Sequence, residues 1–199
     1  MKKVVLIGDS IRLSYWERVA ELLDGECEIL TPEGENCAYT MHTIRRVRDW
    51  FREWGTDRVD LIHWNCGVWD HHRNAEDGEP FSSLEMYLSL QKRLLSQLSR
   101  YSDRLIFATS TPAGKQYVQN PNGLCAIPRE EWNREIALYD EVLCAYLCTK
   151  GVSINDIGGL VGSDTDRFIT PEDGVHLSPE GVEAVSRQTA DAIRARLAE

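Results

Sequence analysis

Residues 4–10 read Val-Val-Leu-Ile-Gly-Asp-Ser, and this stretch decides the fold class. Four consecutive aliphatic residues, two of them β-branched valines, are typical of a strand that is covered on both faces of a parallel sheet. Gly8 then allows a sharp turn, and Ser10 stands where the chain leaves the sheet and a helix begins. Open α/β proteins bind ligands at this edge, and the first amides of a helix favour a negatively charged oxygen. A capping role for Ser10 and a turn role for Asp9 explain the triplet equally well.

Strand and helix patterns alternate along the rest of the chain, which predicts an α/β fold with a parallel sheet. We expect strands at 3–8, 26–30, 58–65, 104–110 and 151–156. We expect helices at 13–24, 40–54, 83–102, 130–150 and 178–198. No repeat or linker divides the sequence, so residues 1–199 are expected to form a single domain. Three long irregular stretches follow strand ends and should surround Ser10, namely 66–82, 111–129 and 157–177.

A second informative stretch lies near the C-terminus, where residues 171–181 read Pro-Glu-Asp-Gly-Val-His-Leu-Ser-Pro-Glu-Gly. Ser178, followed by proline and glutamate, is a well-formed helix start. Asp173 and His176 therefore lie in a loop just before the last helix. At this spacing a carboxylate can orient an imidazole, as a serine esterase requires of its general base. An Asp-x-x-His loop is weak evidence when it stands alone, and Ser10 at the other end of the chain strengthens it.

Together these blocks resemble those of the SGNH hydrolase superfamily, also called the GDSL esterases and lipases. Residues 8–10 match the first family block, and residues 173–181 match the last one. The segments 132–136 and 151–156 follow the family's late helix and last strand. The resemblance implies a flavodoxin-like, three-layer α/β/α sandwich around a central five-stranded parallel sheet.

The resemblance also implies a catalytic triad and two-step acyl transfer. Ser10 would attack an ester carbonyl while His176 removes its proton and Asp173 holds the imidazole in place. His176 would then protonate the departing alcohol, and water would release the acid. Small acyl esters, including O-acetyl groups on carbohydrates, are the substrates that the resemblance favours. No cofactor is expected.

The middle of the chain departs from the family pattern Gly-x-Asn-Asp, in which the asparagine donates to the oxyanion. Here the third expected strand runs into Asn-Cys-Gly-Val-Trp-Asp at 65–70. Aligning Gly67 and Asp70 with the family's glycine and aspartate puts Trp69 at the position of the asparagine. Asn65 is an alternative oxyanion donor at the same strand end, and bracing of the loop by Asn65 is an equally good explanation.

The family's second block, a glycine whose N–H joins the oxyanion hole, has no clean match in residues 31–38. A backbone N–H is available there from Asn36, Cys37 or Ala38, and the Asn36 side chain offers another donor. We therefore expect the oxyanion donors to include Ser10, Asn36, Asn65 and Gly67. The substrate contacts are expected to include Asp9, Trp69 and Asp70.

A run of Asp70, His71 and His72, to which His63 could be added, raises the alternative of a metal site. Consecutive ligands rarely point at one ion, and no metallohydrolase spacing is present. We therefore expect exposed loop histidines or substrate contacts, and no metal.

Composition narrows the class of partner. The chain has 199 residues, of which 42% are hydrophobic and 27% charged, as is ordinary for a soluble globular protein. Its net charge of −10 opposes non-specific binding to nucleic acids or anionic membranes, which leaves a small-molecule ester as the expected partner. No stretch has the pattern of a targeting or transmembrane segment. The six cysteines are scattered without a Cys-x-x-Cys pair, which favours reduced thiols and a cytoplasmic location.

The sequence is also compatible with other functions. The altered middle block is compatible with a non-catalytic protein that binds a carbohydrate or another small ligand on the same fold. Such a protein has no need for Ser10, Asp173 and His176 together. A phosphate or nucleotide binder would need more glycines in the first turn. A thioesterase or acyltransferase would use the same triad, so only substrate tests separate it from an esterase.

Overall fold

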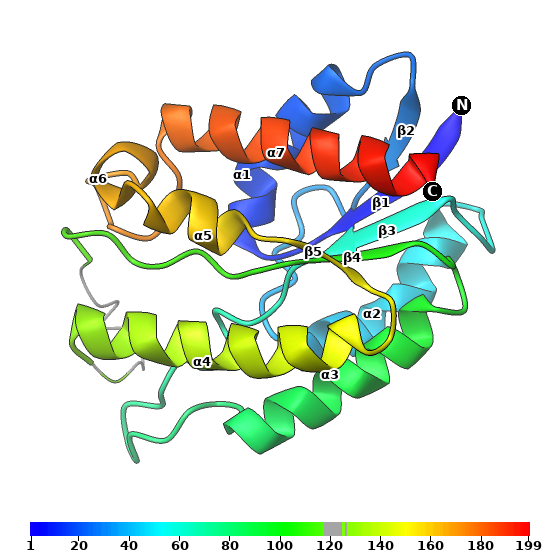
Figure 1. The fold of residues 1–199 in the computed structure, drawn as a ribbon. Coiled ribbons are helices and arrows are strands. Elements are labelled where there is room, and N and C mark those ends of the chain that lie inside the picture. The colour runs from blue at the N-terminus through cyan, green and yellow to red at the C-terminus, as the bar shows by residue number, and fades with distance from the viewer. Residues whose placement is uncertain (118–124, 126) are drawn as a thin grey trace.

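The computed structural model describes residues 1–117, 125 and 127–199 of the chain (Figure 1). The described strands form one five-stranded sheet with the order β2-β1-β3-β4-β5, and every pair in it is parallel. The strands span Lys2–Ile7 (β1), Cys27–Leu30 (β2), Leu61–Trp64 (β3), Leu105–Ala108 (β4) and Ser153–Asn155 (β5). This is the flavodoxin-like order of doubly wound folds, so the expected fold class is confirmed.

The helices lie in two layers, one on each face of the sheet (Figure 1). One layer contains α1 (Ser10–Leu22), α5 (Ile157–Gly162), α6 (Thr165–Phe168) and α7 (Pro179–Ala198). The other contains α2 (Thr40–Glu53), α3 (Leu84–Leu98) and α4 (Arg129–Cys148). In the described part of the chain, no helix is both long and apolar enough to cross a membrane.

The core is divided by the sheet into two hydrophobic clusters. Val4 and Leu6 pack with α1 and α7, whereas Val5 and Ile7 pack with residues of α2, α3 and α4. Successive side chains of a strand point to opposite faces, so β1 contributes to both clusters. All four of these side chains are fully buried, which explains why β1 is a continuous apolar run.

The helix bounds differ from the expected ones where side chains cap the helix ends. Helix α1 begins at Ser10, three residues earlier than expected, because the Asp9 carboxylate accepts a hydrogen bond from the N–H of Ile11. The stretch 157–177 was expected to be irregular, but it contains α5 and α6, which are capped by Asp156 and Asp164. Within the other expected irregular stretches, residues 118–124 and 126 lie outside the described residues.

The topology places Ser10 at the point where the strand order reverses. Strand β1 has β2 on one side and β3 on the other, and its last residue, Ile7, pairs with Trp64 of β3. The chain crosses to opposite faces from these neighbouring strands, which opens a crevice beyond their carboxyl ends. Ser10 follows β1 directly and therefore lies at this crevice.

Candidate active site

Side chains from the two ends of the chain form one hydrogen-bonded row. The Oγ atom of Ser10 lies 2.9 Å from Nε2 of His176, although 166 positions separate the two residues. On the other side of the ring, Nδ1 of His176 lies 2.6 Å from Oδ2 of Asp173. The structure therefore brings together all three residues that the sequence predicted as a triad.

The loop that carries Asp173 and His176 is fixed by backbone hydrogen bonds. The N–H of Thr170 donates to the carbonyl of His176 (2.8 Å), and the N–H of Gly114 donates to the carbonyl of Gly174 (2.8 Å). Gly174 has a φ of +70°, a backbone conformation that favours glycine. These contacts hold the loop between the segment after β4 and the start of α7.

The Asp173 carboxylate is held by three hydrogen bonds. Its Oδ1 atom accepts from the N–H groups of Val175 (2.8 Å) and His176 (2.9 Å), while Oδ2 faces the imidazole. Partial burial raises the pKa of Asp173, but the hydrogen bonds from His176 and Val175 outweigh it, so the pKa lies below the ordinary 3.8. An ionised Asp173 favours a proton on Nδ1, which leaves Nε2 as an acceptor for the Ser10 hydroxyl.

The amide of Ser10 is suited to bind a developing oxyanion. Ser10 is the first residue of α1, so its N–H has no acceptor within the helix. The helix dipole places partial positive charge at the same point. This agrees with Ser10 serving as both nucleophile and amide donor.

Asp9, expected to contact substrate, is only 1% exposed. Its Oδ1 atom caps α1, and its Oδ2 atom has no hydrogen-bond partner in the described part of the structure. Burial raises the pKa of Asp9 to about 6. The expected substrate contact is therefore wrong, because the carboxylate points into the protein and organises the start of the helix instead.

Asp70, also expected to contact substrate, is fully buried. Its carboxylate accepts hydrogen bonds from the N–H and Oγ1 of Thr40 and from the Oγ of Ser82, at 2.8–3.1 Å. It therefore ties the start of α2 to the loop after β3, and the expected substrate contact is wrong. Packing explains why residue 67 is a glycine, since a Cβ atom there would lie 2.8 Å from Oγ of Ser110.

Asn65 is 3% exposed, and its polar groups form hydrogen bonds to the ends of the neighbouring strands. Its side-chain amide donates to the carbonyls of Ala108 (2.9 Å) and Thr109 (3.3 Å), and its backbone N–H donates to Ile7 (2.9 Å). Both amide hydrogens are thus used to join the ends of β3 and β4. The expectation that Asn65 donates to the oxyanion is therefore wrong, and the alternative of a bracing role holds.

The segment after β2 lies beside the end of β1. The N–H of Cys37 donates to the carbonyl of Gly8 (3.2 Å), and the N–H of Ala38 donates to Oδ1 of Asn36 (2.9 Å). Ala38 has a φ of +36°, in a block where the family pattern carries glycine. Among the described residues, Nδ2 of Asn36 forms no hydrogen bond, so this amide remains a candidate donor.

Trp69 lies within a row of aromatic rings, with His72 on one side (centroids 5.1 Å apart) and Tyr39 on the other. The ring centroid of Tyr39 is 5.7 Å from that of Trp69 and 5.5 Å from that of Phe81, edge-on in both cases. Tyr39 and Phe81 also line a groove of about 410 Å³ together with Met41 and Met86. Sequence reasoning did not find this groove, because exposed apolar side chains on two different helices and a loop carry no common pattern.

The histidines of the suspected metal cluster do not converge. His63 is buried, and its Nε2 atom lies 3.1 Å from Nδ2 of Asn155. His71 packs edge-on against Trp132, with the two ring centroids 4.2 Å apart. In the described residues, no group of three histidine, cysteine or acidic side chains is placed to hold a metal ion. Burial lowers the pKa of His63 to about 4, of His71 to about 3 and of His72 to about 4.

We expect the variant His71→Phe to be more resistant to unfolding in acid. Neither ring nitrogen of His71 has a partner among the described residues, and burial with His72 and Arg73 nearby lowers its pKa to about 3. Below about pH 6.5, the ordinary pKa of imidazole, His71 of the unfolded chain takes up a proton, whereas the buried His71 of the folded chain stays neutral. The free energy of unfolding therefore falls as the pH falls.

Phenylalanine removes this proton uptake and keeps the contact with Trp132. The difference in the free energy of unfolding, His71→Phe minus the original chain, should therefore be about 2 kcal/mol larger at pH 5 than at pH 7. Urea unfolding at both values measures it. If the free energies of unfolding of the two proteins change equally with pH, His71 is not held neutral in the folded chain.

Comparisons with known proteins place the fold of this chain in a structural class. No protein-family model matches the sequence, and no curated protein matches it. Among solved structures, an acetyl xylan esterase superposes with a TM-score of 0.73 at 17% identity, covering 96% of this chain and 99% of the other. A member of the lipolytic protein G-D-S-L family from Veillonella parvula reaches 0.71 at 16% identity, with 96% and 98% covered.

A carbohydrate acetylesterase from Sinorhizobium meliloti gives a TM-score of 0.66 at 15% identity, covering 98% of this chain and 99% of that protein. At such identities the likeness establishes the fold. This chain therefore has the fold of the SGNH or GDSL hydrolases and carbohydrate esterases over nearly its whole length. The predicted resemblance is confirmed at that level.

Proposed function

We propose that this chain is a serine ester hydrolase that acts on small acyl esters, with acetyl esters of carbohydrates as the favoured class. The observation that carries the proposal is the continuous contact from Ser10 through His176 to Asp173. A serine that serves only as a helix cap has no need of a histidine within 2.9 Å that is itself oriented by a carboxylate.

In the proposed reaction, Oγ of Ser10 attacks the ester carbonyl as Nε2 of His176 takes its proton. The resulting imidazolium is stabilised by the carboxylate of Asp173. The N–H of Ser10 and a donor from segment 36–38 stabilise the tetrahedral oxyanion. His176 returns the proton to the departing alcohol, and water, activated in the same way, releases the acid from Ser10.

Two observations support small acyl groups on a carbohydrate. Two of the similar structures are described as an acetyl xylan esterase and a carbohydrate acetylesterase. In addition, the half-buried Trp69 and the neighbouring Tyr39 offer apolar ring faces beside the loop after β3. We propose that Trp69 contacts the substrate there.

Labelling with a fluorophosphonate, followed by intact-mass measurement and peptide mapping, tests the proposed nucleophile. We expect one adduct on Ser10 in the original chain, no adduct in Ser10→Ala and strongly slowed labelling in His176→Ala. The physical reason is that the serine hydroxyl is a weak nucleophile until a base removes its proton.

A substrate panel then separates the related activities. Nitrophenyl esters of increasing acyl length, acetylated xylo-oligosaccharides and an acyl thioester are compared by kcat/KM. Preference for acetyl esters supports the proposal, and preference for the thioester would identify a thioesterase. A folded protein that neither labels at Ser10 nor hydrolyses any of these compounds would overturn the proposal in favour of a binding protein.

A further inference from the structure

Arg12, two residues after Ser10, is completely buried. Its Nη2 atom donates to the carbonyls of Gly8 (3.1 Å) and Glu35 (2.6 Å), and its Nη1 atom donates to the carbonyl of Pro32 (3.2 Å). In the described part of the chain, no carboxylate forms a hydrogen bond or an ion pair with this guanidinium. Arg12 therefore donates to three backbone carbonyls and, through Nη2, to Sγ of Cys37 (3.6 Å), while its Nε atom has no partner among the described residues.

This arrangement is specific to arginine. A buried guanidinium is costly unless its N–H groups are satisfied, and a planar fork can reach several carbonyls at once. Here the fork joins the end of β1, at Gly8, to the segment that begins at Pro32. Gly8 itself has no room for a side chain, because a Cβ atom there would lie 2.7 Å from Cβ of Arg12.

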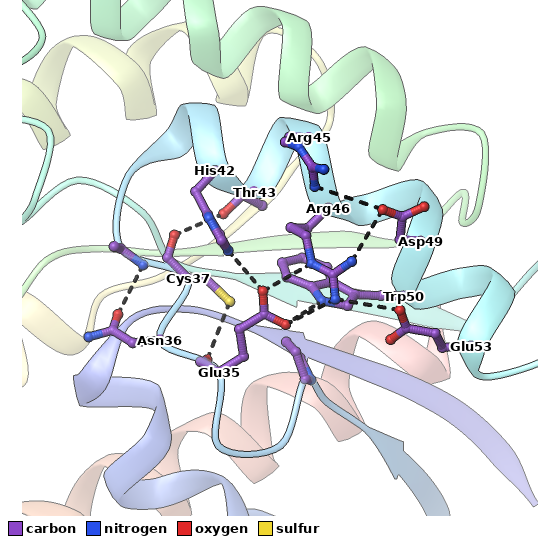
Figure 2. A network of polar contacts seen from close by, with 12 residues as sticks. Glu35, Asn36, Cys37, His42, Thr43, Arg45, Arg46, Asp49, Trp50 and Glu53 are labelled. Carbon is purple, nitrogen blue, oxygen red and sulfur yellow. Dashed lines mark hydrogen bonds and ion pairs between the residues drawn. The ribbon is translucent and has the colours of Figure 1, made fainter.

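Glu35 holds the same segment from the outside (Figure 2). Its carboxylate accepts hydrogen bonds from Nε of Arg46 (3.0 Å) and Nε1 of Trp50 (2.8 Å), and it lies 2.9 Å from Nε2 of His42. All three partners belong to α2. Partial burial raises the pKa of Glu35, but these hydrogen bonds outweigh it and hold the pKa at about 2.

Glu35 is thus bound twice, through its carbonyl to Arg12 and through its carboxylate to α2. The next residues along the chain are Asn36, Cys37 and Ala38, which contain the remaining candidate oxyanion donors. The N–H of Cys37 is already tied to the carbonyl of Gly8, close to the catalytic serine. The side chains of Arg12 and Glu35 therefore both help to fix the position of segment 36–38, and with it the position of these donors relative to Ser10.

We propose that Arg12 and Glu35 are positioning residues for the oxyanion side of the active site. This inference rests on the proposed ester hydrolysis, and neither side chain is assigned a contact with the reacting atoms. Their contribution is to keep segment 36–38 fixed against the end of β1, so that its donor meets the oxyanion as it forms.

The variants Arg12→Lys and Glu35→Gln test this assignment. Lysine keeps the positive charge but cannot bridge three carbonyls, and we expect kcat to fall roughly 10- to 100-fold with KM changed less than about threefold. Glutamine keeps the shape but weakens the contacts to Arg46, so a fall of about three- to tenfold is expected. Glu183→Gln is the matched control, because Glu183 is likewise a partly exposed glutamate whose carboxylate is held by arginine, here Arg18 and Arg187.

A comparison of oxo and thiono esters separates positioning from general destabilisation. A sulfur anion accepts hydrogen bonds weakly, so an intact oxyanion hole favours the oxo ester, and misplaced donors should lower that preference. We expect the oxo/thiono rate ratio to fall in Arg12→Lys and Glu35→Gln and to stay unchanged in Glu183→Gln. Glu35 is partly exposed, so its variant remains informative if Arg12→Lys does not fold.

The outcomes distinguish this inference from the proposed function. If the original chain hydrolyses esters while both variants keep its kcat and its oxo/thiono ratio, the positioning role is overturned and the esterase stands. Lower activity with an unchanged ratio also overturns it, since the loss then has another cause. A folded original chain that hydrolyses no ester overturns both.

Discussion

Replacement of Asp173 by asparagine is expected to lower kcat about 10⁴-fold, with little change in KM. The geometry gives the reason. Oδ1 of Asp173 accepts from two backbone N–H groups, so the amide oxygen of asparagine will take that place. The new NH₂ group then faces Nδ1 of His176 and donates to it. The ring must carry its proton on Nε2, where it can no longer accept the proton of Ser10.

The measurement is steady-state kinetics on an activated acetyl ester, with Asp164→Asn as the control. Asp164 caps α6 through the N–H of Arg167, and asparagine is an equally good cap, so this variant should be fully active. Because hydrogen bonds from His176 and Val175 hold the pKa of Asp173 below its ordinary value, Asp173 should be ionised at neutral pH, and its protonation should not limit activity there. An Asp173→Asn enzyme within tenfold of the original would remove Asp173 from the mechanism.

The main features of the fold were predictable because they rest on local signals. The four aliphatic residues before Gly8 require a strand that is buried on both faces, and such a strand implies helices on both sides of a parallel sheet. The residues of the proposed triad were also predictable. Ser178 and Pro179 mark the start of α7 unambiguously, which places Asp173 and His176 in a loop at the end of the chain.

The surroundings of the triad were not predictable, because distant contacts decide them. Asn65 and Asp70 have the residue types of a binding site. Their side chains instead form hydrogen bonds with Ala108 and Thr40, which lie 43 and 30 positions away, and so connect distant segments. Asp9 could equally have faced substrate or the start of α1. Arg12 has the residue type of a solvent-exposed helix position, and only the approach of Pro32 and Glu35 shows why a charge is buried there.

Replacement of Gly174 by alanine is expected to disable the site and destabilise the protein. Gly174 combines a φ of +70° with a crowded position, since a Cβ atom there would lie 2.2 Å from the backbone nitrogen of Tyr117. The left-handed conformation costs about 1–2 kcal/mol, and relief of the clash adds about 1–3 kcal/mol. The loop must move, and it carries both Asp173 and His176, so we expect kcat to fall at least roughly 100-fold.

Gly78→Ala is the matched control, because Gly78 has a φ of +72° and no atom within 4 Å of the added Cβ. It should show the conformational cost alone, a loss of about 1–2 kcal/mol with unchanged kcat. Urea unfolding and ester kinetics on both variants separate strain from displacement of the triad. If Gly174→Ala matches Gly78→Ala in both measurements, the loop tolerates the side chain. Contact between the loop and the segment after β4 would then not be what aligns His176 with Ser10.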